Sequence, residues 1–338
     1  VWAVDAAGGW PDQLTFFRDK VWTLSASPDG RQMVCLRDIG GNERQQIFLV
    51  TADGTQVRRL TQDDEAIHHF PVWSRDGERV AYASNARNGV HFDVYIQDVN
   101  DAPMMVSQRD GNYRPLAWSP DNARLLLSHE ISSAHQVLYV LDLATGAVHA
   151  LTLLDERVSN RQVRWAKDGT VYLLTNQGRD LMNLARMDVD TGQVVYLEDH
   201  EWDLESLAVS SDARTLAYTA NVDGYARLFL FRLDSGESEQ VMGLPDGVVA
   251  EPAFSPDGTR VAISVQSPNH NLDIWIVDVA TLLCQRLTQS SLAGIPQQSL
   301  VEPDLIRYET FDGRSVPAFL YRPEGVEPPL PIILYVHG

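Results

Sequence analysis

The sequence predicts an all-β fold, a seven-bladed β-propeller, and two observations support this prediction. First, a short turn with an aspartate recurs six times at intervals of 44 to 47 residues, a period typical of propeller blades. Second, every repeat contains four short strand-like segments, which is the number of strands in a blade. The turn aspartates are Asp29, Asp76, Asp121, Asp168, Asp212 and Asp257.

The first copy of this turn, Ser27-Pro28-Asp29-Gly30, indicates why it connects two strands. Proline presets φ, aspartate hydrogen-bonds to nearby backbone, and glycine adopts a positive φ without steric cost. An apolar residue lies three positions before each aspartate, and an apolar strand follows each turn. These preceding residues are Ala26, Trp73, Trp118, Trp165, Val209 and Phe254.

Residues 1–17 have the pattern of the second half of a repeat. Apolar segments at 2–5 and 13–17 flank a turn at Gly8-Gly9, and the same pattern returns in the later repeats at 47–61, 138–152 and 274–288. We therefore expect a propeller domain over 1–289, with a partial first blade at 1–17 and six full blades at 18–289. The chain opens inside a repeat, so we also expect that the natural N-terminus is missing.

The connections between the second and third strands of each blade are predicted to be longer and more polar than the other turns. They should lie on one face of the propeller together with the blade-to-blade links. Because binding residues are often carried on loops of a rigid scaffold, we expect partner contact on that face. The predicted connections are 37–45, 84–92, 129–136, 176–182, 221–226 and 266–272.

The repeat stops after residue 289, and a different organisation follows. Residues 290–303 are rich in Ser, Gln and Pro and indicate a linker. A hairpin is predicted around the turn Asp312-Gly313. The continuous apolar run at 332–338 is typical of a strand buried on both faces of a parallel sheet. This run has no place in the propeller pattern.

Composition excludes several classes of partner. The net charge is −19 and the basic residues form no cluster, which argues against binding to a nucleic-acid backbone. No apolar run approaches about 18 residues, so no membrane span is predicted. The two cysteines, Cys35 and Cys284, are expected to be buried free thiols, and a cytoplasmic location is expected. The sequence does not indicate the oligomeric state.

The combination of Ser-Pro-Asp-Gly blades with the C-terminal motifs resembles the prolyl oligopeptidase (S9) family of serine peptidases. The C-terminal motifs are the hairpin from Tyr308 to Pro323, with its Leu-Tyr-Arg-Pro ending, and the apolar run that ends in His337-Gly338. The acylaminoacyl-peptidase and dipeptidyl-peptidase branches are the most similar. The resemblance implies that 304–338 begins an α/β-hydrolase domain, and that His337 and Gly338 open a His-Gly-Gly-Pro motif beside the oxyanion hole. It also implies a propeller that admits short peptides to a cleft and excludes folded proteins.

The sequence departs from the family at the site of catalysis. No Gly-x-Ser-x-Gly motif is present, and in the family the Ser, Asp and His of the triad come later in the chain. We therefore expect this chain alone to be inactive, with the missing catalytic domain and short peptides as its partners and no cofactor. The paired glutamates of the dipeptidyl-peptidase branch are not found, so the sequence does not select among acylamino, dipeptidyl and post-proline specificity. The alternative function is a non-enzymatic, TolB-like propeller scaffold that binds protein partners.

Within the chain, two kinds of polar cluster are candidate sites. The loop around Gly40-Gly41 is interpreted either as a salt-bridged corner or as a wall of the substrate chamber, and its candidate residues are Arg37, Asp38, Asn42, Glu43 and Arg44. The histidines His68, His69, His129 and His135 could serve acid–base or metal chemistry or belong to polar blade links. The first two follow the acidic run Asp63-Asp64-Glu65. No metal site is predicted.

Overall fold

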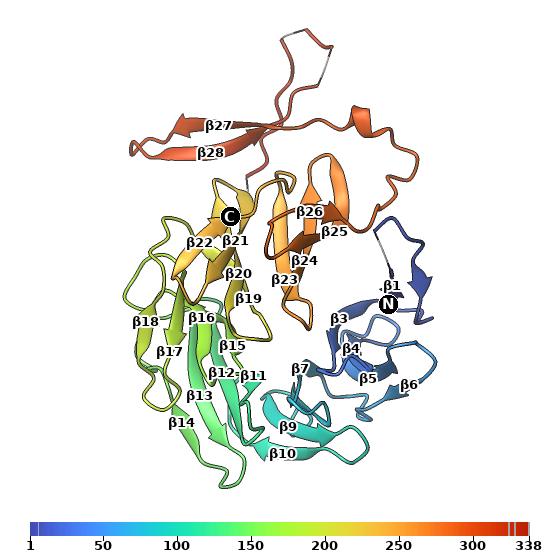
Figure 1. Cartoon of the computed structure of the whole chain (residues 1–338), viewed down its shortest axis with the longest axis vertical. Coiled ribbons are helices and arrows are strands. Elements are labelled where there is room, and N and C mark those ends of the chain that lie inside the picture. Colours follow the sequence, from blue (N-terminus) through green and yellow to red (C-terminus); the bar gives the residue numbers. More distant parts are fainter. Residues whose placement is uncertain (6, 324, 328, 337–338) are drawn as a thin grey trace.

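A computed structural model describes residues 1–5, 7–323, 325–327 and 329–336 of the chain. Six four-stranded antiparallel sheets form the blades of a propeller, with the first strand of each blade nearest the centre (Figure 1). The strands of blades one to three are β3 (Val21–Ala26), β4 (Gln32–Arg37), β5 (Gln46–Thr51), β6 (Val57–Arg59), β7 (His68–Trp73), β8 (Arg79–Ser84), β9 (Asp93–Asp98), β10 (Met104–Ser107), β11 (Tyr113–Trp118), β12 (Arg124–Ser132), β13 (His135–Asp142) and β14 (Val148–Ala150). The strands of blades four to six are β15 (Asn160–Trp165), β16 (Val171–Thr175), β17 (Asn183–Met187), β18 (Val194–Tyr196), β19 (Leu204–Val209), β20 (Thr215–Val222), β21 (Tyr225–Arg232), β22 (Glu237–Gln240), β23 (Val248–Phe254), β24 (Arg260–Ser267), β25 (His270–Asp278) and β26 (Cys284–Arg286).

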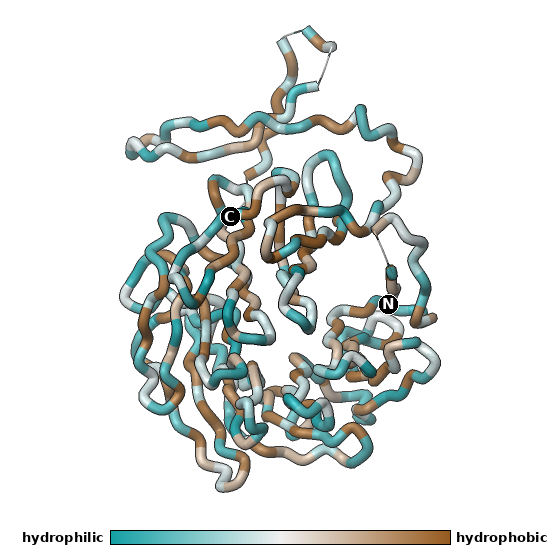
Figure 2. The backbone as a smooth tube through the Cα atoms, viewed as in Figure 1, coloured by the Kyte–Doolittle hydropathy of each residue, from teal (hydrophilic) through white to brown (hydrophobic). Residues whose placement is uncertain are grey.

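The hydrophobic core is divided among the interfaces between neighbouring blades. The middle strands of blades one to five are largely buried on both faces, those of blade six mainly on one, and Figure 2 shows hydrophobic segments within the blades. Leu126 of blade three and Leu173 of blade four, for example, belong to one buried cluster with Trp165. Each blade therefore depends on its neighbours for burial, which explains why the repeat cannot fold as an isolated unit.

The recurring turn has the chemistry that its sequence predicts. In the first copy, Ser27 Oγ donates to Asp29 Oδ1 at 2.6 Å, and the backbone N–H of Arg31 donates to the same carboxylate oxygen at 3.1 Å. Ser27 Oγ also accepts from the N–H of Gln32 at 3.0 Å, which closes the turn onto β4. The turn at Asp168 has alanine in place of the serine and keeps only the backbone contact from Thr170.

The predicted count of seven blades is wrong: the structure has six. The N-terminal half-repeat forms only a hairpin of two short strands, β1 (Trp2–Ala3) and β2 (Asp12–Gln13), because no inner strands pair with it among the described residues. In Figure 1 this hairpin lies between the sixth blade and the first.

The N-terminal hairpin nevertheless repeats the contacts of an outer blade half. The amino group of Val1 donates to Thr15 Oγ1 at 2.6 Å, as the N–H of Ile47 donates to Thr61 Oγ1 at 3.0 Å, and both pairs are 14 residues apart. The N–H of Gly8 donates to the carbonyl of Leu287 at 3.1 Å, which joins the hairpin to the end of blade six. On the other side, the hairpin contributes apolar residues to the buried cluster of blade one. The hairpin thus connects the two ends of the ring.

The second-to-third-strand connections follow the prediction in only half of the blades. Blades one, two and four carry longer loops, at 38–45, 85–92 and 176–182. In the other three blades both strands extend further, and only a tight turn remains between them. These turns are Ser133-Ala134, Asp223-Gly224 and Pro268-Asn269. The longer loops are therefore confined to three blades.

The C-terminal segment forms the predicted hairpin but not the predicted buried strand. After a 3-10 turn, η1 (Gln297–Ser299), strands β27 (Asp304–Glu309) and β28 (Ser315–Leu320) pair antiparallel. The hairpin contacts the turn of blade five, where Arg307 pairs with Asp223 and the Phe319 ring lies 4.9 Å from that of Tyr225. The apolar residues 332–336 lie in no strand and are exposed, because no described strand flanks them. No helix in the described ranges is long and apolar enough to cross a membrane.

Candidate functional site

Arg37, at the start of the candidate loop, is held in place by charge and by aromatic rings. Its guanidinium forms an ion pair with Asp19 at 2.7 Å. The same group lies over the rings of Phe17 and Phe48, at 4.5 and 5.0 Å from their centroids. Such stacking on two rings favours arginine over lysine at this position. Arg37 therefore anchors the loop to the N-terminal segment.

Asp38 connects the loop to the innermost strand of blade one. Its carboxylate is buried and accepts a hydrogen bond from Trp22 Nε1 at 3.4 Å and another from the N–H of Glu43 at 3.3 Å. Glu43 has a positive φ of 58°, a conformation that is uncommon outside glycine. The buried carboxylate thus fixes both the loop backbone and the indole of Trp22.

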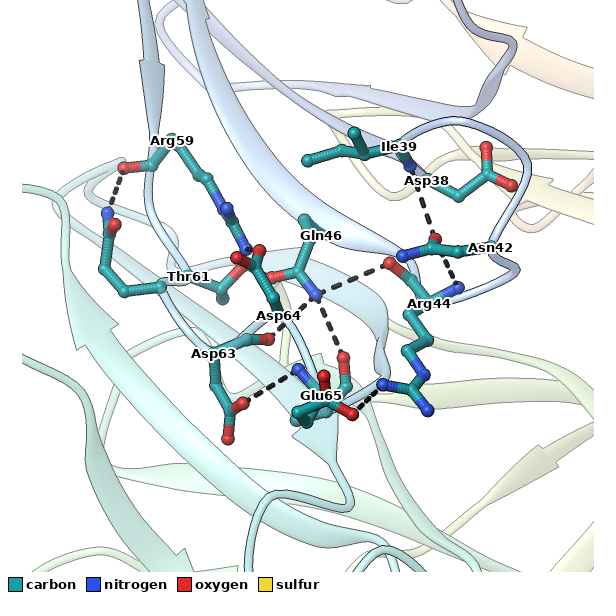
Figure 3. Close-up of polar contacts among 12 residues, drawn as sticks. Asp38, Ile39, Asn42, Arg44, Gln46, Arg59, Thr61, Asp63, Asp64 and Glu65 are labelled. Atoms are coloured by element: carbon teal, nitrogen blue, oxygen red, sulfur yellow. Dashed lines mark hydrogen bonds and ion pairs between the residues drawn. The ribbon is translucent and has the colours of Figure 1, made fainter.

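The remaining loop residues make a tight, polar corner (Figure 3). Asn42 Oδ1 accepts from the N–H groups of Ile39 at 3.4 Å and Arg44 at 3.1 Å. The Arg44 guanidinium pairs with the carboxylate of Glu65, in the link to blade two. Asn42 and Glu43 leave their side chains exposed to solvent. The corner is salt-bridged, as one of the two interpretations of the sequence expected.

Gln46, the first residue of β5, fastens this loop to the following blade link. Figure 3 shows its side chain between the two segments. Gln46 Nε2 donates to the carbonyls of Asp63 at 3.0 Å and Ala66 at 2.9 Å, while Gln46 Oε1 accepts from Thr61 Oγ1 at 2.9 Å. The acidic residues 63–65 are exposed and take part in this link, where Asp63 also lies near His68.

Ion pairs between a second-to-third-strand connection and the next link recur around this face. Arg87 pairs with Asp110 at 3.1 Å and with the buried Asp93 at 2.6 Å. An equivalent pair follows in blade four, as Arg179–Asp199, and in blade five Arg227 of β21 pairs with Asp246 of the next link. The predicted polar face is thus held by a series of local ion pairs.

Two of the histidine candidates, His68 and His129, pack against tyrosine rings. His68 is buried with its ring 5.7 Å from that of Tyr82, and burial lowers its pKa to about 4. His129 stacks on Tyr113 with ring centroids 4.3 Å apart, and burial lowers its pKa as well. In the part of the chain that the structure describes, no group of three or more His, Cys, Asp or Glu side chains is placed to hold a metal ion. The metal interpretation of these residues is therefore not supported by geometry.

A cavity of about 430 Å³ lies beside the candidate loop, and sequence reasoning did not identify it. The innermost strands of three consecutive blades, β3, β7 and β11, form its walls. Trp22, Val72 and Leu116 give it an apolar lining, and Gln45 and Arg114 contribute polar groups. Trp22 is the residue that Asp38 holds, so the candidate loop and the cavity form one site.

A bulge in β7 shapes this cavity. The register of β7 on β8 shifts between His69 and Val72, and Phe70 within the bulge has a φ of 54°. A left-handed backbone is a strained conformation for an aromatic residue. The Phe70 ring lies under the guanidinium of Arg114, 4.5 Å from the centroid. One sequence signal was available, since Pro71 inside a predicted strand marks an edge or a bulge.

His337 and Gly338, the candidates for the oxyanion-hole strand, lie outside the described residues.

Comparisons with known proteins agree with this fold. The family model described as the TolB beta propeller domain matches residues 170–304. Among curated proteins, the dipeptidyl-peptidase 5 of Porphyromonas gingivalis is 25% identical over 286 residues, which cover 80% of this chain and 41% of that protein. The enzyme of the same name from Porphyromonas endodontalis is 24% identical over 258 residues, covering 71% of this chain and 36% of the relative. The chain thus spans less than half the length of these relatives.

Solved structures match over most of the chain. A prolyl endopeptidase structure, from a study of two such enzymes, has a TM-score of 0.80 at 13% identity, covering 96% of this chain and 51% of that one. A puromycin hydrolase structure has a TM-score of 0.76 at 17% identity, and the match covers 93% of this chain and 53% of that one. The structure of TolB from Acinetobacter baumannii has a TM-score of 0.56 at 20% identity, and the match covers 78% of this chain and 62% of that one. The resemblance to the propeller portion of S9 peptidases is therefore confirmed.

Proposed function

We propose that this chain is the substrate-gating N-terminal propeller of a serine peptidase that hydrolyses short peptides, of acylaminoacyl- or dipeptidyl-peptidase type. The observation that carries the proposal is the alignment with dipeptidyl-peptidase 5, which extends over 80% of this chain. On this proposal 1–289 is the propeller, 290–303 the linker, and 304–338 the start of the catalytic domain. The nucleophile, its Asp and its His lie outside the 338 residues, and His337 and Gly338 lead into the oxyanion hole.

The candidate loop and the cavity give the gating role a physical basis. Trp22 and Phe70 are exposed aromatic rings on the innermost strands, where a peptide passing along the propeller axis would contact them. Arg37 and Asp38 hold the loop from within, and the side chain of Glu43 and the amide group of Asn42 remain exposed to meet a substrate. The chamber role of the loop is thus compatible with its salt-bridged structure.

The alternative is a TolB-like scaffold for protein partners, and the family match at residues 170–304 favours it. A free-standing scaffold does not account for the β27–β28 hairpin or for the exposed apolar run at 332–336. The prolyl endopeptidase structure also matches this chain over a greater share than TolB does. These observations support the peptidase over the scaffold.

The test uses the complete protein that contains this chain. The purified protein should hydrolyse dipeptidyl or N-acylated aminoacyl nitroanilides and react with a fluorophosphonate probe at one serine. It should leave folded proteins intact. The 338-residue chain alone should neither hydrolyse these substrates nor react with the probe. A complete protein that shows neither labelling nor hydrolysis, and that captures a protein partner instead, would overturn the peptidase in favour of the scaffold.

A further inference from the structure

We propose that the cavity between β3, β7 and β11 binds the C-terminal end of a short peptide, with Arg114 holding the carboxylate and the aromatic wall holding an apolar last side chain. The choice of a peptide as ligand rests on the proposed function. The binding site itself is argued from the geometry of the cavity.

Arg114 has no direct ion-pair partner among the described residues, although Glu130 lies near enough to act on its charge. It forms no hydrogen bond or ion pair with any residue that the structure describes, and its Nε atom is buried without a partner. Its one defined contact is the ring of Phe70, at 4.5 Å. A carboxylate that enters the cavity can accept charge-assisted hydrogen bonds from the Nη groups. An anionic ligand would thus satisfy the group that the fold leaves unpaired.

The charge of the cavity favours a single carboxylate. His69 also lines the cavity, and burial lowers its pKa, so it is neutral at pH 7. Arg114 is therefore the one cationic side chain among the lining residues. A group with one negative charge, such as a peptide C-terminus, matches this site better than a phosphate does.

The remaining lining indicates what precedes the carboxylate. Trp22, Val72 and Leu116 present apolar surface, which suits an apolar side chain. Gln45 Oε1 is buried without a partner, at the edge of the same cavity. The Gln45 side chain would have to rotate before a peptide N–H could donate to it. A cation beside apolar walls in a cavity of about 430 Å³ suits the carboxylate and side chain of an apolar C-terminal residue.

The bulge in β7 brings an aromatic ring to the wall of the cavity. Phe70 keeps a left-handed φ of 54° although it is exposed and contributes little to the core. In this conformation the Phe70 ring lies beneath the guanidinium of Arg114. The same left-handed bulge recurs in the innermost strands of blades four and six, at Gln162 and Glu251, so only the aromatic ring and its arginine are particular to this cavity.

The test is calorimetric titration of the 338-residue chain with N-acetyl-Ala-Phe, with its C-terminal amide, and with N-acetyl-Ala-Gly. The free acid should bind, the amide should bind at least about tenfold more weakly, and the glycine peptide should bind more weakly than the phenylalanine peptide. Arg114→Met should reduce affinity for the acid at least about tenfold and should remove the preference for acid over amide. Arg31→Met, which removes an exposed arginine elsewhere in blade one, should leave the affinity unchanged.

Phe70→Gly provides a second variant, because glycine accepts the positive φ and the substitution relieves strain instead of adding it. This variant should stay folded and should weaken binding of the acid several-fold. The proposal is overturned if the acid does not bind, if acid and amide bind equally, or if both variants bind like the unmodified chain. None of these readouts needs hydrolysis, so the two proposals can fail separately. The cavity can fail to bind the peptide although the complete protein is an active peptidase, and it can bind the peptide although the complete protein is inactive.

Discussion

Gly54, in the turn between β5 and β6, approaches the carbonyl of Leu14 so closely that a Cβ at position 54 would overlap the oxygen. The same relationship links two full blades, where Gly192 approaches the carbonyl of Leu151. The N-terminal hairpin therefore packs on blade one as a blade packs on its neighbour, although it supplies only two short strands.

Gly54→Ala should detach this hairpin. A positive φ of 70° costs alanine about 1–2 kcal/mol, and the overlap with Leu14 should add roughly 1–3 kcal/mol. Gly30→Ala is a matched control, because Gly30 has the same φ of 70° and no atom near the position of its Cβ. Hydrogen exchange should show faster exchange of the amides of residues 1–15 in Gly54→Ala alone. Equal destabilisation by both variants would mean that the close approach contributes nothing.

The stability of the propeller should fall as the pH decreases from about 6.5 to 4. Burial lowers the pKa of His68 from 6.5 to about 4, so the unfolded chain binds a proton in this range and the folded chain does not. A depressed pKa in the folded state stabilises the protein above the unfolded pKa, and that stabilisation is lost as pH falls toward the folded pKa. The shift corresponds to up to about 3 kcal/mol.

Urea unfolding of His68→Phe at pH 7 and at pH 4.5 measures this effect. The variant should lose less stability between the two pH values than the unmodified chain loses. His149→Gln, at an exposed position, should keep the full pH dependence. The assignment to His68 would be wrong if His68→Phe and the unmodified chain had parallel profiles.

The serine of the recurring turn should keep the pKa of the turn aspartate low. The hydroxyl of Ser255 donates to Asp257 at 2.6 Å, and this bond, followed by donors from Thr259, lowers the pKa of Asp257 from 3.8 to about 2. The stabilisation is therefore present above about pH 4 and is lost as pH falls through about 2. In Ser255→Ala, NMR titration should give a higher pKa for Asp257. Ser235→Ala, whose hydroxyl accepts only a backbone N–H, should leave the pKa of Asp257 unchanged.

The apolar residues at 332–336 should promote self-association. Ile333 and Leu334 are 95% and 83% exposed, and contiguous exposed apolar surface is a typical cause of aggregation. Replacing both by serine should reduce light scattering and leave the melting temperature nearly unchanged. Deletion of 304–338 should have the same effect, since the hairpin contacts blade five mainly through Phe319 and Arg307. The control replaces Val90 and Met242, two separate exposed residues, and should not change scattering. A large fall in melting temperature on deletion would show instead that the segment belongs to the propeller.

Most of the propeller could be predicted because its determinants are local. The Ser27–Asp29 contact needs residues that are two positions apart, and the hairpin at 304–320 needs alternation and an Asp-Gly turn. The predicted blade count was wrong because the sequence shows how many strand-like segments there are, but not whether they pair. The N-terminal half-repeat completes a blade only if two inner strands from elsewhere pair with it.

The site was harder to predict because it depends on the relative placement of three blades. The pairing of Phe70 with Arg114 joins residues of neighbouring repeats, through a backbone conformation that aromatic residues seldom adopt. The loop prediction also failed where strands extended past their expected ends, as at Asp223-Gly224. That dipeptide is itself a signal for a tight turn, and the sequence reasoning treated it as part of a longer loop.

The hydrogen bond from Gly8 to Leu287 also affects how the free energy of unfolding is distributed among the blades. A linear array of repeats unfolds from its ends, because a terminal unit has one stabilising interface and an internal unit has two. In a closed ring every unit has two interfaces, so no blade is a preferred starting point for fraying. Here a single two-stranded hairpin gives blades one and six their second interface. Loss of that hairpin would convert a ring into an open chain of six units, with a broader thermal transition that begins at its two ends.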